Sequence, residues 1–116
     1  ALTTRLRFSN DIFSAMKVGL FFGSFNPIHV GHLIIGNLMA ETTDLKKVWY
    51  VVSPQNPFKP SKGLLHEFDR YDMVRAAVYD SYKLEVTYVE FNLPKPSYTI
   101  HTLVHLSEKH PDKEFK

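Results

Sequence analysis

The chain of 116 residues contains no cysteine. This absence excludes disulfide bonds, cysteine-ligated zinc sites and catalysis by a thiol, and it fits a reducing compartment. No apolar run approaches the ~20 residues that a helix needs to cross a bilayer. Arg5, Arg7, Asn10 and Asp11 interrupt the stretch in which a signal-peptide core would lie. We therefore expect a cytoplasmic protein without a membrane partner.

An excess of charge of one sign is also missing. The formal net charge is +2, and the basic residues are scattered along the sequence. The broad basic surface of a nucleic-acid-binding protein is therefore absent, and no nucleic-acid partner is expected. Apolar residues, by contrast, make up 44% of the chain. That fraction is enough to bury a core, and the length leaves room for one domain.

The apolar residues alternate between strand patterns and helix patterns. Continuous apolar runs are typical of strands buried on both faces of a parallel sheet, whereas spacings of three and four indicate helices. The patterns predict strands at residues 17–22, 48–52, 84–89 and 113–116. They predict helices from residue 33 to an end within residues 41–44, at residues 66–79 and at residues 100–110. This alternation predicts an α/β fold, a Rossmann-like three-layer αβα sandwich around a parallel sheet with right-handed crossovers.

The helix expected at residues 66–79 divides into two faces. Tyr71, Val74, Ala77 and Val78 form an apolar stripe at the helical period. The other face is expected to be charged and solvated, and it carries Glu67, Asp69, Arg70, Asp72 and Arg75.

Residues 1–15 show no clear period and precede Met16-Lys17, which resembles a natural start. We interpret residues 1–15 as an N-terminal extension and residues 16–116 as the domain. A short helix that packs on the domain is the alternative for the first fifteen residues.

Three loops follow the predicted strands and are expected to meet at one edge of the sheet. They are residues 23–32, 54–63 and 94–99. Three prolines between residues 54 and 60 preclude regular structure in the second loop. Because ligands of such folds bind beyond the carboxyl ends of the strands, these loops predict the position of the site.

The first loop holds the strongest signal for a site. A strand ends near Gly23, the chain turns at Asn26-Pro27, and a helical pattern begins after residues 29–32. The first amides of a helix have no intrahelical acceptor and carry the positive end of its dipole. The loop therefore predicts an anion-binding site at a helix N-terminus.

His29 and His32 lie three positions apart, and so near one face of the first helical turn. Three interpretations are open at this point: half-exposed histidines of which one caps the helix, metal ligands, or parts of the anion site. The absence of nearby carboxylates and of cysteine argues against a metal site, and none is expected. Gly31 leaves the backbone open where a ligand would approach.

Residues 23–32, Gly-Ser-Phe-Asn-Pro-Ile-His-Val-Gly-His, closely resemble the signature of the nucleotidylyltransferase superfamily, whose HxGH motif holds the phosphates of a nucleoside triphosphate. Ser97-Tyr98-Thr99-Ile100 with Thr102-Leu103 looks like the "SYTIDTL" segment of bacterial nicotinate-mononucleotide adenylyltransferases. Pro57-Phe58-Lys59 is similar to the end of that family's proline-rich loop, and Arg70 and Met73 match its usual pattern. His101 departs, since the family usually has Asp there, and we expect it to face outward.

This resemblance implies an enzyme of NAD biosynthesis. The phosphate of nicotinate mononucleotide would attack the α-phosphorus of ATP, giving nicotinate adenine dinucleotide and pyrophosphate. Such a displacement requires positioning and charge stabilisation rather than a protein nucleophile. That requirement fits a sequence in which no Ser-His-Asp set is apparent.

The resemblance also implies the site residues. The catalytic groups would be His29, His32 and Lys59, with the histidines donating hydrogen bonds to phosphate and, when protonated, supplying charge. ATP would be bound by Gly23, Ser24, Phe25, His29, Gly31 and His32. Nicotinate mononucleotide would be bound by Ser24, Phe25, Asn26, Lys59, Tyr98 and Thr99. The Thr99 amide would meet the nicotinate carboxylate, the alternative being that Thr99 only caps its helix. Mg²⁺ would accompany ATP, held mostly by phosphate oxygens and water.

Several alternatives stay open. Another superfamily member, such as pantetheine-phosphate adenylyltransferase or a cytidylyltransferase, is the nearest one. Family members continue beyond the equivalent of residue 116 with a strand, an aromatic-bearing loop and a Ser/Thr-Arg motif that also contacts ATP. We therefore expect a C-terminally truncated domain, for which a non-catalytic nucleotide-binding module is a further alternative. The oligomeric state is open, and a homo-oligomer is one option.

Overall fold

The computed structural model describes residues 15–54, 63–95 and 98–116. The N-terminal extension predicted at residues 1–15, except for residue 15, lies outside these residues, and so do Lys59 and Ser97. In order along the chain, the elements are β1 (Met16–Gly23), α3 (Val30–Thr42), β2 (Lys47–Val52), α4 (Glu67–Val78), β3 (Leu84–Thr87), the 3₁₀ helix η1 (Val89–Asn92), α5 (Thr99–Lys109) and β4 (Lys113–Phe115).

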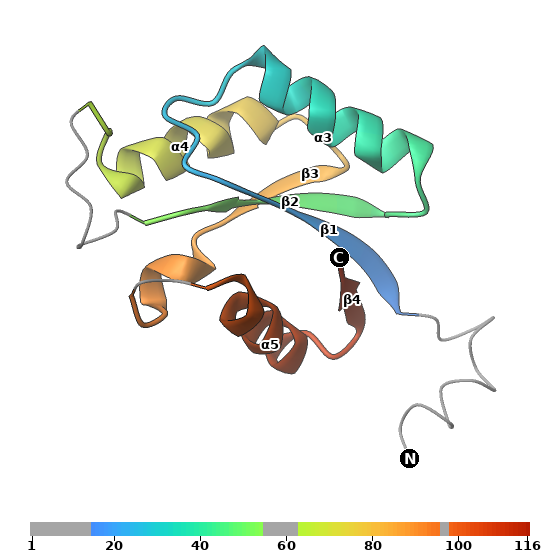
Figure 1. Ribbon diagram of the computed structural model, residues 1–116. Helices are drawn as coiled ribbons and strands as arrows, with labels where there is room; N and C mark the ends of the chain where they lie inside the picture. The colour runs from blue at the N-terminus through green and yellow to red at the C-terminus, as the bar shows by residue number, and fades with distance from the viewer. Residues whose placement is uncertain (1–14, 55–62, 96–97) are drawn as a thin grey trace, which may run out of the picture.

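The four described strands form one parallel sheet in the order β3-β2-β1-β4. Helices α3 and α4 cover one face, and α5 lies on the other face (Figure 1). The predicted three-layer αβα arrangement is therefore confirmed. The strand order reverses at β1, because β2 and β3 extend the sheet on one side of it and β4 on the other. In such sheets this reversal opens a crevice at the carboxyl end of the strands.

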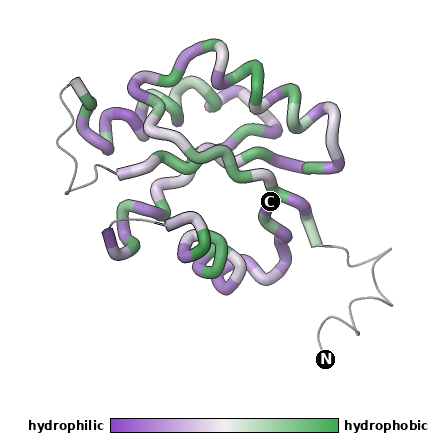
Figure 2. Tube along the Cα trace, in the orientation of Figure 1, coloured by the Kyte–Doolittle hydropathy of each residue, from purple (hydrophilic) through white to green (hydrophobic). Residues whose placement is uncertain are grey.

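The core lies between β2 and helices α3 and α4. Tyr50, Val52 and Val74 are inaccessible to solvent, and Ala40 and Val78 are almost so. Apolar residues run along the crossing strands, as Figure 2 shows. The continuous apolar pattern of residues 48–52 correctly predicted a buried strand. In β1 most side chains are only half-buried, so the prediction of burial on both faces is wrong for that strand.

The prediction that Arg70 lies on the charged, solvated face of α4 is wrong. Arg70 is completely buried, in line with Val74 and Val78 one and two turns further along the helix, whereas Ala77 is exposed. The inward stripe of α4 thus repeats every four residues from Arg70. A guanidinium can occupy such a position because backbone carbonyls accept its hydrogen bonds there.

Strand β3 is shorter than its alternating pattern predicted. The hydroxyl of Thr87 accepts a hydrogen bond from the amide of Val89 at 3.2 Å, and η1 begins at that residue. This local side-chain bond replaces the next bond of the sheet ladder and ends the strand. None of the helices in the described part of the chain has the length and apolar character that a bilayer crossing requires.

Candidate functional site

The loop between β1 and α3 turns sharply at Phe25. This residue has φ 48° and is 2% exposed, so its ring is buried although its backbone lies in the left-handed region. The ring packs within 5.0 Å of the His32 ring and 5.4 Å of the Tyr50 ring, between centroids. A Cβ on Gly23 would approach the same ring to 3.1 Å. Phe25 therefore anchors the loop with its side chain and leaves its backbone to line the site.

His29 and His32 cap the first turn of α3 with their side chains, each of which accepts a hydrogen bond from a backbone amide. His29 Nδ1 accepts from the amide of Gly31 at 3.1 Å, and His32 Nδ1 accepts from the amide of His29 at 3.1 Å. The two rings stack with centroids 3.7 Å apart and an interplanar angle of 22°. This is the reciprocal geometry of a capping box, built here from two imidazoles.

The reciprocal cap fixes the tautomer of both histidines. A nitrogen that accepts a hydrogen bond carries no proton, so each neutral ring holds its proton on Nε2. Burial, and then the neighbouring His29, lower the pKa of His32 from its ordinary value. At neutral pH His32 is therefore a neutral Nε2–H donor in the unliganded protein rather than a charge.

Gly31 leaves room for the His29 ring. A Cβ on Gly31 would lie 3.0 Å from His29 Cε1 and 3.1 Å from its Nδ1, which is tighter than ordinary contact. A glycine at this position thus lets the imidazole fold back over the first turn. This reason was not apparent from the sequence, where the open backbone suggested only the approach of a ligand.

A pocket of about 490 Å³ opens beside this cap at the carboxyl end of β1. It brings together most of the residues that the resemblance had assigned to ATP and the nucleotide phosphate. Its lining residues are Phe21, Phe22, Gly23, Ser24, Phe25, Asn26, Pro27, His29 and His32. The pocket thus combines the loop at the end of β1 with two imidazoles at the start of a helix, whose positive dipole end and Nε2–H groups suit an anion.

The Asn26 side chain connects this loop to the next one. Its Nδ2 donates to the carbonyl of Gly63 at 2.9 Å, and its Oδ1 accepts from the amide of Leu65 at 2.9 Å. Both polar atoms of the amide are thus engaged by backbone. The geometry gives Asn26 a part in holding the loops together as well as a place in the pocket lining.

Tyr98 and Thr99 lie at the start of α5, on the other face of the sheet from α3, and outside the described lining of this pocket. Tyr98 is the N-cap residue and makes no side-chain cap, whereas Thr99 is the first helical residue. The alternative that Thr99 caps the helix is therefore wrong. Its amide belongs to the helix start, where intrahelical acceptors are missing. His101 is exposed, as expected.

A buried pair of residues holds helix α5 to the 3₁₀ helix η1. Thr102 is inaccessible and donates from its hydroxyl to Glu90 Oε2 at 2.7 Å, and Glu90 is 4% exposed. Burial raises the pKa of Glu90 above its ordinary value, and the hydrogen bond from Thr102 opposes that shift. No pattern in the sequence predicted this pair.

The donors around the pocket do not form a set that would hold a resident metal ion. Among the described residues no three His, Cys, Asp or Glu side chains come together in that way. The pocket lining also contains no carboxylate, the ligand type that Mg²⁺ prefers. A divalent cation that enters with a nucleotide would be part of that substrate.

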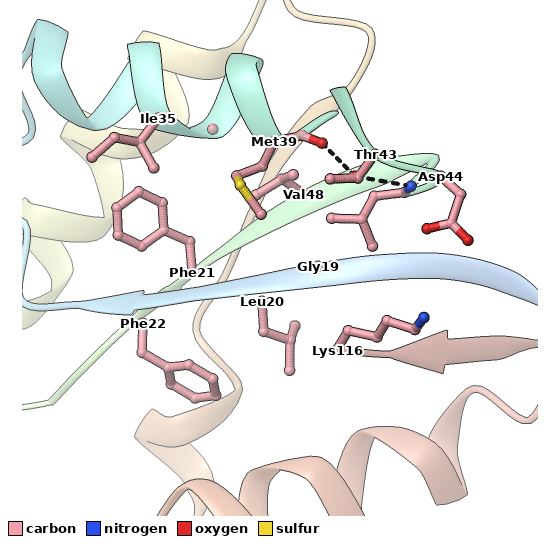
Figure 3. A pocket seen from close by; sticks show the side chains of 12 residues that line it. Gly19, Leu20, Phe21, Phe22, Ile35, Met39, Thr43, Asp44, Val48 and Lys116 are labelled. Atoms are coloured by element: carbon pink, nitrogen blue, oxygen red, sulfur yellow. Dashed lines mark hydrogen bonds between the residues drawn. The ribbon is translucent and has the colours of Figure 1, made fainter. Parts of the chain in front are cut away.

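A second pocket of about 490 Å³ lies between α3 and β1. Ile35 and Met39 extend from α3 toward Phe21 and Gly19 of the strand (Figure 3). Its walls are almost wholly apolar, and the Thr43 hydroxyl on its rim is engaged by the carbonyl of Met39. Lys116 and Asp44 bring charges of opposite sign to this lining, and little other polar surface lies beside them, so the loop at the end of β1 is the better candidate site for an anion.

Comparison with known proteins places the chain in a family. The model of the cytidylyltransferase-like family matches residues 20–112. The chain belongs to the cytidylyltransferase-like family. Within this family, the chain is 68% identical over 100 residues to a probable nicotinate-nucleotide adenylyltransferase of Cytophaga hutchinsonii, over 86% of this chain and 52% of that protein. A protein of the same name from Flavobacterium psychrophilum is 53% identical over the same shares. The chain thus spans about half the length of these curated relatives.

A solved structure shares the fold of this cytidylyltransferase-like chain. Plasmodium falciparum nicotinic acid mononucleotide adenylyltransferase complexed with NaAD superposes with a TM-score of 0.67 at 19% identity, over 85% of this chain and 49% of that one. The same protein complexed with APC gives a TM-score of 0.63 at 18% identity. At this level of identity the likeness supports the fold.

Proposed function

We propose that this chain carries the substrate-binding core of a nicotinate-nucleotide adenylyltransferase. The observation that carries the proposal is the pair of imidazoles at the start of α3, fixed with both Nδ1 atoms on backbone amides at the edge of the pocket. Curated relatives up to 68% identical bear that enzyme's name. The substrates would be ATP, with its Mg²⁺, and nicotinate mononucleotide.

The proposed reaction is one in-line displacement. An oxygen of the mononucleotide phosphate forms a bond to the α-phosphorus of ATP, and the bond from that phosphorus to the bridging α–β oxygen breaks. Pyrophosphate leaves with the electron pair, and nicotinate adenine dinucleotide is the other product. No group of the protein needs to become covalently attached.

The histidine pair would stabilise the charge that develops on the ATP phosphates. The Nε2–H groups of His29 and His32 would be the donors held in place before the substrate arrives, because the amides of His29 and Gly31 are already engaged by the two Nδ1 atoms. Donors positioned in advance lower the barrier because they need no reorganisation during the reaction. Gly23, Ser24 and Phe25 would contribute backbone groups to both substrates.

The second substrate would occupy the carboxyl edge of the sheet next to ATP. Asn26 would lie beside its phosphate, and the amide of Thr99 would bind the nicotinate carboxylate at the start of α5, with Tyr98 against the ring. An anionic carboxylate suits a helix N-terminus better than a neutral amide does. Lys59, which lies outside the described residues, would contact phosphate.

Release of pyrophosphate with different acceptors tests the proposal. The chain would be assayed alone and fused to the C-terminal half of the Cytophaga hutchinsonii relative, with ATP and either nicotinate mononucleotide, nicotinamide mononucleotide or pantetheine phosphate. We expect the fused protein to turn over only with the pyridine mononucleotides, and faster with the nicotinate form. Turnover with pantetheine phosphate alone would contradict the proposal.

For the unfused chain, nucleotide binding without catalysis is the second candidate function. ATP binding without release of pyrophosphate would show that the chain alone is a nucleotide-binding module. Because the chain covers only about half of its relatives, the fused protein is the one on which the enzymatic proposal depends.

A further inference from the structure

Arg70 is a buried cation that neither the sequence pattern nor the proposed chemistry explains. Its side chain is 0% exposed, and it lies in the first turn of α4. Its Nε donates to the carbonyl of Leu65 at 2.9 Å, and its Nη1 donates to the carbonyls of Ser24 and Ser53, each at 2.7 Å. The three acceptors belong to three different segments.

Those three segments meet at the carboxyl edge of the sheet. Ser24 follows β1 and lines the pocket, Ser53 follows β2, and Leu65 precedes α4. Ser53 also donates from its amide to the carbonyl of Gly23 at 2.9 Å. The guanidinium therefore lies where the loop of the histidine pair meets both ends of the connection from β2 to α4.

Stability alone is a poor reason for a cation at this position. Burial lowers the pKa of Arg70 from its ordinary value, while Glu67 opposes that shift, and an arginine stays charged at neutral pH. Within the described part of the chain its Nη2 is buried and has no hydrogen-bond partner. A buried charge with an unsatisfied donor costs free energy that an apolar residue of similar size would avoid. What an apolar residue cannot do is bind three carbonyls at once.

We infer that Arg70 is a positioning residue that fixes the loop of His29 and His32 against Ser53 and Leu65, which lie at the two described ends of the β2–α4 connection. Its planar fork of donors joins the two parts of the edge at which ATP and nicotinate mononucleotide are proposed to meet. This inference rests on the proposed function for its effect on the substrates. The linkage between the segments rests on the geometry alone.

Hydrogen exchange and ATP calorimetry on the 116-residue chain test the inference together. Arg70→Lys keeps the charge but replaces the fork by one nitrogen, and Arg70→Met keeps the volume without donors. Arg75→Lys and Arg75→Met on the exposed side of α4 are the matched controls. We expect both Arg70 variants to speed amide exchange at residues 23–26 and 63–65 together, while amides of β2 stay protected. We expect their dissociation constant for ATP to rise about tenfold or more.

Unchanged exchange at both segments in the folded Arg70 variants would overturn the inference, whatever happens to ATP. If the fused protein also fails to bind ATP, the proposed function fails, and the exchange measurement on the 116-residue chain still decides the linkage. If Arg70→Met unfolds, Arg70→Lys decides in the same way. An unchanged ATP affinity beside faster exchange would show that the linkage is structural only, and would overturn the positioning role.

Discussion

The hydroxyl of Tyr50 donates a hydrogen bond of 2.7 Å to the carbonyl oxygen of His32, and so ties the central strand β2 to the first turn of α3. Tyr50 is completely buried, and burial raises its pKa to about 12. Helix α3 comes this close to the strand because residue 36 is glycine. A Cβ on Gly36 would lie 2.0 Å from the Tyr50 oxygen and 2.9 Å from its Cζ.

Tyr50→Phe and Gly36→Ala test this contact. We expect Tyr50→Phe to lower the free energy of unfolding by about 1 kcal/mol, the net value of a typical hydrogen bond. Gly36→Ala forces a Cβ against the packed ring of Tyr50 and should lower the free energy of unfolding by about 1–3 kcal/mol. The double variant should lose less free energy of unfolding than the two single variants lose together, because removing the hydroxyl relieves the closest clash. Urea unfolding measures all four proteins, with Tyr82→Phe at an exposed position as the control.

The lowered pKa of His32 predicts a loss of stability in mild acid. The unfolded chain takes up a proton near the ordinary value of about 6.5, whereas the folded chain does so only at lower pH. The free energy of unfolding should therefore fall as the pH drops below about 6.5, and the loss should end below the folded pKa. Protonation of Nδ1 would also break the bond from the His29 amide.

His32→Gln separates titration from capping in that measurement. Glutamine at the third helical position still reaches back to the cap amide, yet it does not titrate. We expect its unfolding free energy to depend less on pH across the same window. An equally steep dependence would show that another group causes the acid sensitivity.

Glu90 predicts a pH effect of the opposite sign. Its pKa is raised by burial, so between the ordinary value of about 4.3 and the folded value the folded state binds more protons than the unfolded state. The stability contributed by protonated Glu90 is complete below the ordinary value and is lost as the pH rises through the folded one. Glu90→Gln should flatten this part of the profile, and Glu108→Gln at an exposed position of α5 should leave it unchanged. A profile that Glu90→Gln leaves as it was would contradict the assignment.

Local patterns in the sequence were enough to predict the fold, but they did not predict the features of the site that depend on contacts between distant segments. Apolar period and loop position were enough to predict the parallel sheet, its layers and the place of His29 and His32. The same periodicity predicted that Arg70 lies on the solvated face. A charged residue in a sequence pattern is taken for a surface residue unless the acceptors that would satisfy it in the core are known. Those acceptors belong to other segments of the chain. The mutual cap of the two histidines depends on ring orientation, which spacing alone does not determine.

Calorimetric titration of ATP into the unmodified chain, His32→Ala and the control His105→Ala tests the central claim most directly. His105 is exposed on α5, far along the sequence from the pocket. Loss of the Nε2–H donor and of the cap should raise the dissociation constant about tenfold or more in His32→Ala. In the fused enzyme the same change should cost about 2.7 kcal/mol or more of transition-state stabilisation, as for a lost oxyanion donor. Equal ATP affinity in a folded His32→Ala chain would contradict the claim that the histidine pair holds the phosphates.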